Sequence, residues 1–239
     1  MPTTSQHPRI VILGGTSGIG LATAQLVAAQ GARVVIVGRR QVDRALTQLP
    51  DDAEGHAVDM RDENAIRDLF STLGSFDHLA YTAGETLTLG TVGDMDLDGA
   101  RGALEIRLWG AYAAVKHGHP HIRPGGSITL SSGSAFARPH PTWSIAAAVC
   151  GAVEALTRAL AVELAPIRVN AIAPGVVRTD LWRDLSESER AELYVGVGAG
   201  LPVGRVGEPE EIAQAFAYLM HNGYTTGTIL PINGGGLLV

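Results

Sequence analysis

The sequence predicts an α/β fold, with a doubly wound parallel sheet of about seven strands and helices on both faces. Short β-type runs alternate with helical patterns along the chain, as repeated βαβ units do. The length of 239 residues suits one large domain. Hydrophobic residues make up 46% of the chain and glycines number 30, which is typical of a buried sheet flanked by Ala-rich helices.

Local signals support the individual elements. Val149, Val153 and Leu160 recur at helical spacing, and Pro166 stops that helix soon after its last apolar residue. Pro209, followed by two glutamates, is a favourable start for the last helix. In chain order, the predicted strands are 9–13, 33–37, 56–58, 78–81, 127–130, 168–172 and 228–232, and the predicted helices are 19–30, 63–73, 100–116, 143–164 and 209–220.

Residues 178–207 interrupt this alternation. They contain a short helical pattern over 186–194 and then a glycine-rich stretch. Two interpretations remain open, a lid over a cleft and a surface excursion. Because no long linker, repeat or low-complexity tract is present, we expect residues 1–239 to form a single domain.

Composition narrows the class of function. The net charge of −6 and the absence of a basic stripe argue against nucleic-acid binding. The single cysteine excludes an internal disulfide and suits a reducing compartment. The first ten residues lack the apolar core of a signal peptide, and no uninterrupted apolar run approaches the ~20 residues that span a bilayer. We therefore expect a cytoplasmic protein without a membrane segment.

A glycine-rich turn gives the clearest functional signal. The segment RIVILGGTSGIG runs from a predicted strand into a predicted helix. Glycines at such a turn let the main chain approach a pyrophosphate, while the helix N-terminus supplies amide donors and partial positive charge. This pattern predicts a Rossmann-type dinucleotide site, in which the contacts at the turn are Gly14, Thr16, Ser17, Gly18, Ile19 and Gly20.

The same turn resembles the glycine motif of the short-chain dehydrogenase/reductase family, and the resemblance extends over nearly the whole chain. YTAG at 81–84 is similar to the family's NNAG, with both asparagines replaced. SITLSSGSA resembles the fifth strand with its serine, and residues 151–180 follow the family pattern throughout. The terminal INGG completes the set, with Asn233 for the usual aspartate.

The resemblance implies further cofactor contacts along the chain. The second strand ends in Gly38-Arg39-Arg40. At this place NAD-binding folds carry an acidic residue, whereas an arginine accommodates the 2′-phosphate of NADP. We therefore favour NADP(H) over NAD(H), with an exposed basic pair as the alternative. By resemblance, the remaining cofactor contacts are Asp59 with Met60, Ala83, Gly84, Pro174, Gly175, Val177 and Thr179.

The resemblance also exposes a gap in the catalytic machinery. Family members carry a tyrosine that protonates the substrate carbonyl and, four residues later on the same helix face, a lysine that lowers the tyrosine pKa. In this chain the matching positions are Ala146 and Cys150. The family's serine is matched best by Ser132, with Ser134 as a second candidate. A serine that merely caps the end of a strand is the other interpretation.

Two further residues are candidates for the missing chemistry. Arg107 matches the family's asparagine, where it either binds an anion, replaces the lost lysine charge, or lies on the helix surface paired with Glu105 or another acid. His140 lies in a loop that borders the substrate in the family, and it is either a general acid or a solvated side chain. Cys150 itself is expected to be small core packing.

Three hypotheses about function follow from this pattern. The first is an NADP(H)-dependent oxidoreductase acting on a small carbonyl or alcohol substrate, with proton transfer re-routed through Ser132, His140 or water. The second is a non-catalytic NADP(H)-binding sensor or supporting subunit, and the third is a different chemistry in which Arg107 recognises an anionic substrate. The resemblance further implies a homodimer or homotetramer assembled through the helices over 100–116 and 143–164.

Overall fold

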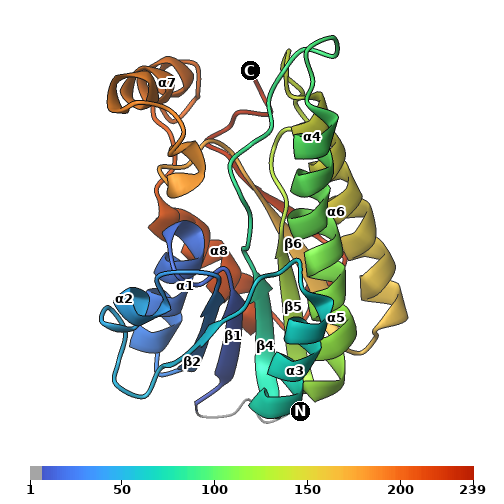
Figure 1. Ribbon diagram of the computed structural model, residues 1–239. Coiled ribbons are helices and arrows are strands. Elements are labelled where there is room, and N and C mark those ends of the chain that lie inside the picture. The colour runs from blue at the N-terminus through green and yellow to red at the C-terminus, as the bar shows by residue number, and fades with distance from the viewer. Residues whose placement is uncertain (1–6) are drawn as a thin grey trace.

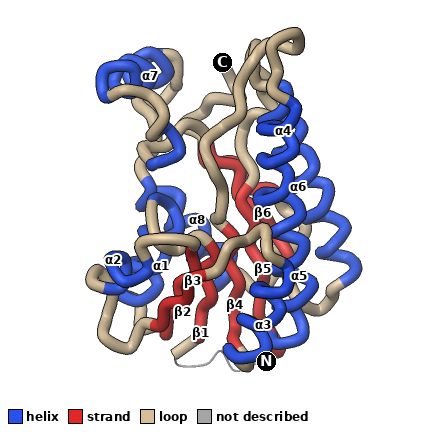
Figure 2. The backbone as a smooth tube through the Cα atoms, in the orientation of Figure 1, coloured by secondary structure: helices blue, strands red, loops and turns tan. Residues whose placement is uncertain are grey.

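The computed structural model describes residues 7–239 and contains one sheet of seven parallel strands in the order β3-β2-β1-β4-β5-β6-β7. Figure 2 shows these strands side by side, with helices on both sides of the sheet. The predicted fold class is therefore confirmed. The strands are β1 (Arg9–Leu13), β2 (Arg33–Gly38), β3 (Glu54–Ala57), β4 (Phe76–Tyr81), β5 (Ile122–Ser131), β6 (Arg168–Pro174) and β7 (Ile229–Ile232).

Successive residues of the central strands feed two separate cores. In β1, Val11 and Leu13 pack into a cluster with α3 (Glu63–Leu73), α5 (Ala111–Gly118) and α6 (Ser144–Glu163). The intervening β1 residues face the opposite side of the sheet, because side chains alternate along a strand. There they pack with the helices α1 (Gly18–Ala29), α2 (Val42–Leu46) and α8 (Pro209–His221) (Figure 1). Burial on both faces explains why the strands read as continuous apolar runs.

Side-chain caps explain where several helices begin. The Asp62 carboxylate accepts a hydrogen bond from the Ala65 amide at the start of α3. Asp96 accepts from the amides of Asp98 and Gly99, so α4 (Leu97–Leu104) begins three residues earlier than predicted. Two other predictions were wrong in detail, since β3 lies over Glu54–Ala57 rather than 56–58, and the short helix α2 was not predicted.

A single long helical rod replaces the helix predicted over 100–116. It consists of α4, a π-helical turn (Glu105–Gly110) and α5. Such π-helical turns occur frequently at functional sites, because the extra residue per turn re-aims the side chains that follow. Arg107 lies in the middle of this turn.

The irregular segment after β6 forms its own small core above the cleft. It contains a short helical turn (Asp180–Trp182) and the helix α7 (Glu187–Ala199), which stands away from the sheet in Figure 1. Trp182 and Tyr194 are buried together, and Leu87 and Trp143 from two other loops pack against them. Because Leu87, Trp143 and Trp182 all line the cleft described below, the lid interpretation of this segment is favoured over a surface excursion.

One described helix, α6, is long and apolar enough to cross a membrane by length and composition alone. The expectation of no membrane segment rested on uninterrupted apolar runs, which Glu154 and Arg158 break in α6, and it stays a prediction. A core helix of a soluble protein passes the same test, and α6 packs against β6 through one face. The prediction about a signal peptide rests largely on residues 1–6, which lie outside the described residues.

Candidate active site

A cleft of about 480 Å³ opens at the carboxyl ends of the central strands, within the range typical of ligand sites. After β3, at one edge of the sheet, the chain crosses to β4, which lies on the other side of β1. The winding direction therefore reverses, and the switch point lies between the neighbouring strands β1 and β4. Parallel α/β sheets bind their ligands at this switch point. All predicted cofactor contacts except Gly20 line the cleft, and so do Ser132, Ser134 and Arg107.

The glycine turn is shaped for close approach of a ligand. Gly14 has a φ of 92°, and a Cβ placed on it would lie 2.5 Å from the main-chain nitrogen of Ala83. Gly20 lies behind the turn rather than in the cleft, where a Cβ would lie 2.2 Å from the carbonyl oxygen of Gly14. The turn delivers the N-terminus of α1 to the cleft, and its free amides suit an anionic group.

Arg39 lies in a cluster of charges at one end of the cleft. Its guanidinium is 3.1 Å from a carboxylate oxygen of Glu85 and 3.5 Å from one of Asp59. Arg61 pairs with the same two carboxylates, at 2.6 Å and 3.7 Å. Because the Arg39 side chain is 41% exposed, a phosphate can draw it from this cluster at small cost. The sequence analysis missed Glu85 and Arg61, although Glu85 directly follows the YTAG segment.

One face of α6 forms the floor of the other half of the cleft. Ala146 and Cys150, one turn apart, both line it. The Ser132 hydroxyl donates to the Cys150 carbonyl oxygen at 3.2 Å and lies 3.4 Å from a carboxylate oxygen of Glu154, one turn further along. Glu154 is buried and was missed, although its spacing of eight from Ala146 places it on the same helix face. Ser132 therefore connects the cleft to a buried carboxylate.

Arg107 reaches the same floor from the π-helical turn. Its guanidinium donates to the Glu85 main-chain carbonyl at 2.8 Å and lies flat against Gly84, where a Cβ would be 2.7 Å from Nη2. Burial lowers the pKa of Arg107, whereas Cys150 and Glu85 nearby raise it. Burial has the opposite effect on the Cys150 thiol, whose pKa it raises, and the Arg107 charge opposes that rise. The interpretation of Arg107 as a surface residue paired with Glu105 was wrong, because the π-helical turn directs it inward.

His140 and Tyr81 lie away from the floor of the cleft. His140 is exposed, packs against Trp143 with the two rings tilted and their centroids 5.7 Å apart, and does not line the cleft. Its role as a general acid stays a prediction, which this position does not favour. Tyr81 is buried and donates its hydroxyl hydrogen to the Ile106 carbonyl. Burial raises the pKa of Tyr81, so this phenol is unsuited to proton transfer.

Comparison with known proteins agrees with this geometry. The family model described as enoyl-(acyl carrier protein) reductase matches residues 14–236. The short-chain dehydrogenase/reductase ATR9 of Stachybotrys chlorohalonatus is 33% identical over 257 residues, covering 100% of both chains. The chain belongs to the short-chain dehydrogenase/reductase family. A solved structure of a small-chain dehydrogenase in complex with NADPH is 37% identical, with a TM-score of 0.89, covering 98% of this chain and 100% of the other.

A further relative within the family has a named substrate. The cis-4-hydroxycyclohexanecarboxylate dehydrogenase of Sinomonas cyclohexanicum is 35% identical over 240 residues, covering 94% of each chain. The chain described in Figure 1 has Ala146 and Cys150 on the helix face where the resemblance places tyrosine and lysine. Among the residues that line its cleft, no tyrosine or lysine side chain occurs. The family's fold and cofactor cleft are therefore present.

Proposed function

We propose that the protein is an NADP(H)-dependent oxidoreductase of small carbonyl or alcohol substrates, in which proton transfer is slow because the tyrosine–lysine pair is absent. The observation that carries this proposal is a cleft that joins the glycine turn and Arg39 to a floor made by Ala146, Cys150 and Ser132. The NADPH complex of a similar protein and the hydroxy-acid dehydrogenase among the relatives support it.

The residues present fit such a cofactor. The glycine turn and the α1 N-terminus would hold the pyrophosphate, and Arg39 would hold the 2′-phosphate. When bound, NADP(H) supplies or accepts the hydride. Ser132 would orient the substrate oxygen through its hydroxyl, and the proton would reach that oxygen from water. A positioned acid contributes about 10²–10⁴-fold to rate, so its loss predicts slow turnover.

The absence of the tyrosine–lysine pair from α6 also supports a second function. A protein that binds NADP(H) without turnover, as a sensor or supporting subunit, has no need of an acid at Ala146 or a cation at Cys150. Steady-state oxidation of NADPH with a panel of ketones and aldehydes separates the two functions. Slow, saturable consumption supports the oxidoreductase, whereas tight NADPH binding without consumption supports the binding role.

Arg39 is expected to set a preference for NADPH over NADH. A charge-assisted contact with phosphate contributes about 1.5–3 kcal/mol, more than the exposed ion pairs that Arg39 gives up. Fluorescence titration should therefore show tighter binding of NADPH than of NADH, and Arg39→Ala should remove most of this difference. Arg61→Ala is the matched control, because Arg61 pairs with the same carboxylates but does not line the cleft. Equal wild-type affinities for both cofactors would overturn the assignment.

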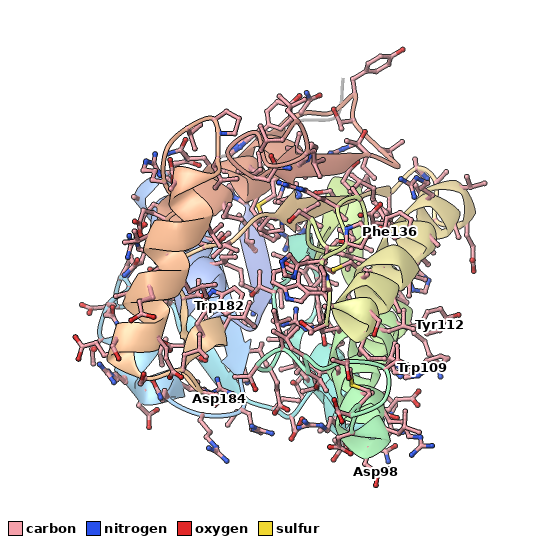
Figure 3. All side chains as sticks on the ribbon, turned by 90° about the horizontal axis from the view of Figure 1, so that it is seen from above. Asp98, Trp109, Tyr112, Phe136, Trp182 and Asp184 are labelled. Atoms are coloured by element: carbon pink, nitrogen blue, oxygen red, sulfur yellow. The ribbon has the colours of Figure 1, made fainter. Side chains whose placement is uncertain are left out.

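We further propose a homodimer or homotetramer built on the rod that contains α5 and on α6. Trp109 and Tyr112 project outward from this rod (Figure 3) and are 58% and 45% exposed, while Val162 on α6 is 81% exposed. Aromatic side chains of this size are enriched in interface cores. Light scattering should show more than one chain per particle, and Trp109→Glu with Tyr112→Glu should yield monomers. A monomeric wild type would contradict the proposal.

A further inference from the structure

We infer that Arg107 is an anion-binding residue of the substrate site, and that the substrate is a carboxylic acid with an apolar body. This inference rests on the proposed function, because it names the substrate class of the same cleft. Its starting point is a cationic side chain that the fold places in the cleft without an acidic partner.

The first step concerns the charge balance of Arg107. Among residues 7–239, the ion pairs include Arg39 and Arg61 with the Glu85 carboxylate, but none includes Arg107. Arg107 reaches only the main-chain carbonyl of Glu85, which carries no net charge. A desolvated charge in a protein is normally paired, because leaving it unpaired is costly. A ligand anion would supply the missing partner.

The second step excludes the cofactor as the source of that anion. The pyrophosphate of a dinucleotide would lie at the glycine turn and the N-terminus of α1, and the 2′-phosphate would lie at Arg39. Arg107 contacts neither of these positions, and its electrostatic neighbours are Cys150, Tyr81 and Glu85. The Cys150 thiol on the α6 floor is among these neighbours, so the guanidinium also borders the half of the cleft that is left for the substrate.

The third step uses the shape of that half. Ala146 contributes only a methyl group to that half, and several apolar side chains line its walls. A planar guanidinium can hold a carboxylate through two parallel hydrogen bonds, and exclusion of water strengthens such a pair. The walls that would contact the body of the acid include Leu87, Trp143, Ile145, Val149 and Leu181.

Calorimetric titration of the NADP⁺ complex tests this inference without requiring turnover. The probes are benzoate, cyclohexanecarboxylate and hexanoate, each paired with its neutral amide. We expect at least one acid to bind saturably and about tenfold or more tightly than its amide, because only the acid pairs with the guanidinium. Arg107→Gln should lose this discrimination, and Arg107→Lys should keep part of it. Arg101→Gln, an exposed arginine on α4 paired with Asp98, is the matched control and should behave as wild type.

Each alternative outcome is distinct. If no acid is preferred over its amide, or if Arg107→Gln keeps the preference, the inference is wrong. If Arg107→Gln instead weakens NADPH binding and leaves acid binding unchanged, Arg107 serves the cofactor and the inference is also wrong. Failure of the proposed function would appear separately, as absence of NADPH binding by the wild type. The acid titration of the cofactor-free protein would then still test Arg107.

Discussion

Introducing the tyrosine–lysine pair at positions 146 and 150 of α6 is expected to raise the rate of NADPH-dependent reduction of neutral carbonyl compounds by about 10²–10⁴-fold. This factor is the contribution of a positioned acid. The change combines Ala146→Tyr, Cys150→Lys and Arg107→Asn. The tyrosine would supply the proton, the lysine would lower its pKa, and the asparagine would remove the guanidinium that now lies beside position 150. The measurement is steady-state NADPH oxidation with a panel of ketones and aldehydes.

The third substitution follows from the structure rather than from the sequence pattern. The charge of Arg107 acts on the thiol of Cys150, so a lysine at that position would face a like charge in a partly desolvated site. Ala146→Tyr with Cys150→Lys alone should therefore gain less than the triple variant. Ala146→Tyr alone should gain least, because no lysine then stands one helical turn away to lower the phenol pKa from its ordinary value near ~10.

Steric cost is the principal complication of this experiment. Ala146 is only 8% exposed, and overpacking commonly costs about 1–3 kcal/mol. Folding and NADPH binding are therefore measured first, by circular dichroism and fluorescence titration. A triple variant that folds, binds NADPH and reduces nothing in the panel would show that the cleft no longer positions a carbonyl. That result would sink the oxidoreductase proposal and favour the binding role.

Much of the fold could be predicted from the sequence because local patterns and fold agree. Continuous apolar runs mark strands buried on both faces, and the glycine turn between β1 and α1 marks the ligand edge of the sheet. The cofactor half of the site depends on main-chain shape at residues such as Gly14 and Gly18, so a contiguous motif predicts residues that do line one cleft.

The other half of the site could not be predicted because it depends on contacts between distant segments. The direction of Arg107 is set by a π-helical turn and by the bare Cα of Gly84, neither of which leaves a periodic signal. Glu154 was missed because a single acid on an apolar helix resembles a solvated residue until the helix is packed. Glu85 was missed because its partner Arg39 lies 46 residues earlier, on a different strand end.

Gly20→Ala is expected to weaken NADPH binding by about tenfold or more, equivalent to about 1.4 kcal/mol, although Gly20 does not line the cleft. The added Cβ would lie 2.2 Å from the Gly14 carbonyl oxygen and 2.5 Å from the Thr82 hydroxyl oxygen. The first of these atoms is main chain, so the glycine turn itself must move. Because the turn and the α1 N-terminus would hold the pyrophosphate, displacement of the turn should be measured directly as a higher Kd for NADPH.

The same substitution elsewhere separates this effect from helix propensity. Gly102 in α4 has no atom within 4 Å of the position that a Cβ would take, so Gly102→Ala should stabilise the protein by about 0.5–1 kcal/mol and leave the Kd unchanged. Gly20→Ala receives the same gain in propensity, yet it should lower the free energy of unfolding by about 1–3 kcal/mol through overpacking. Chemical denaturation of both variants measures the change in the free energy of unfolding, which should be positive for Gly102→Ala and negative for Gly20→Ala. If Gly20→Ala is as stable as Gly102→Ala and binds NADPH like the wild type, close packing behind the turn does not control the cofactor site.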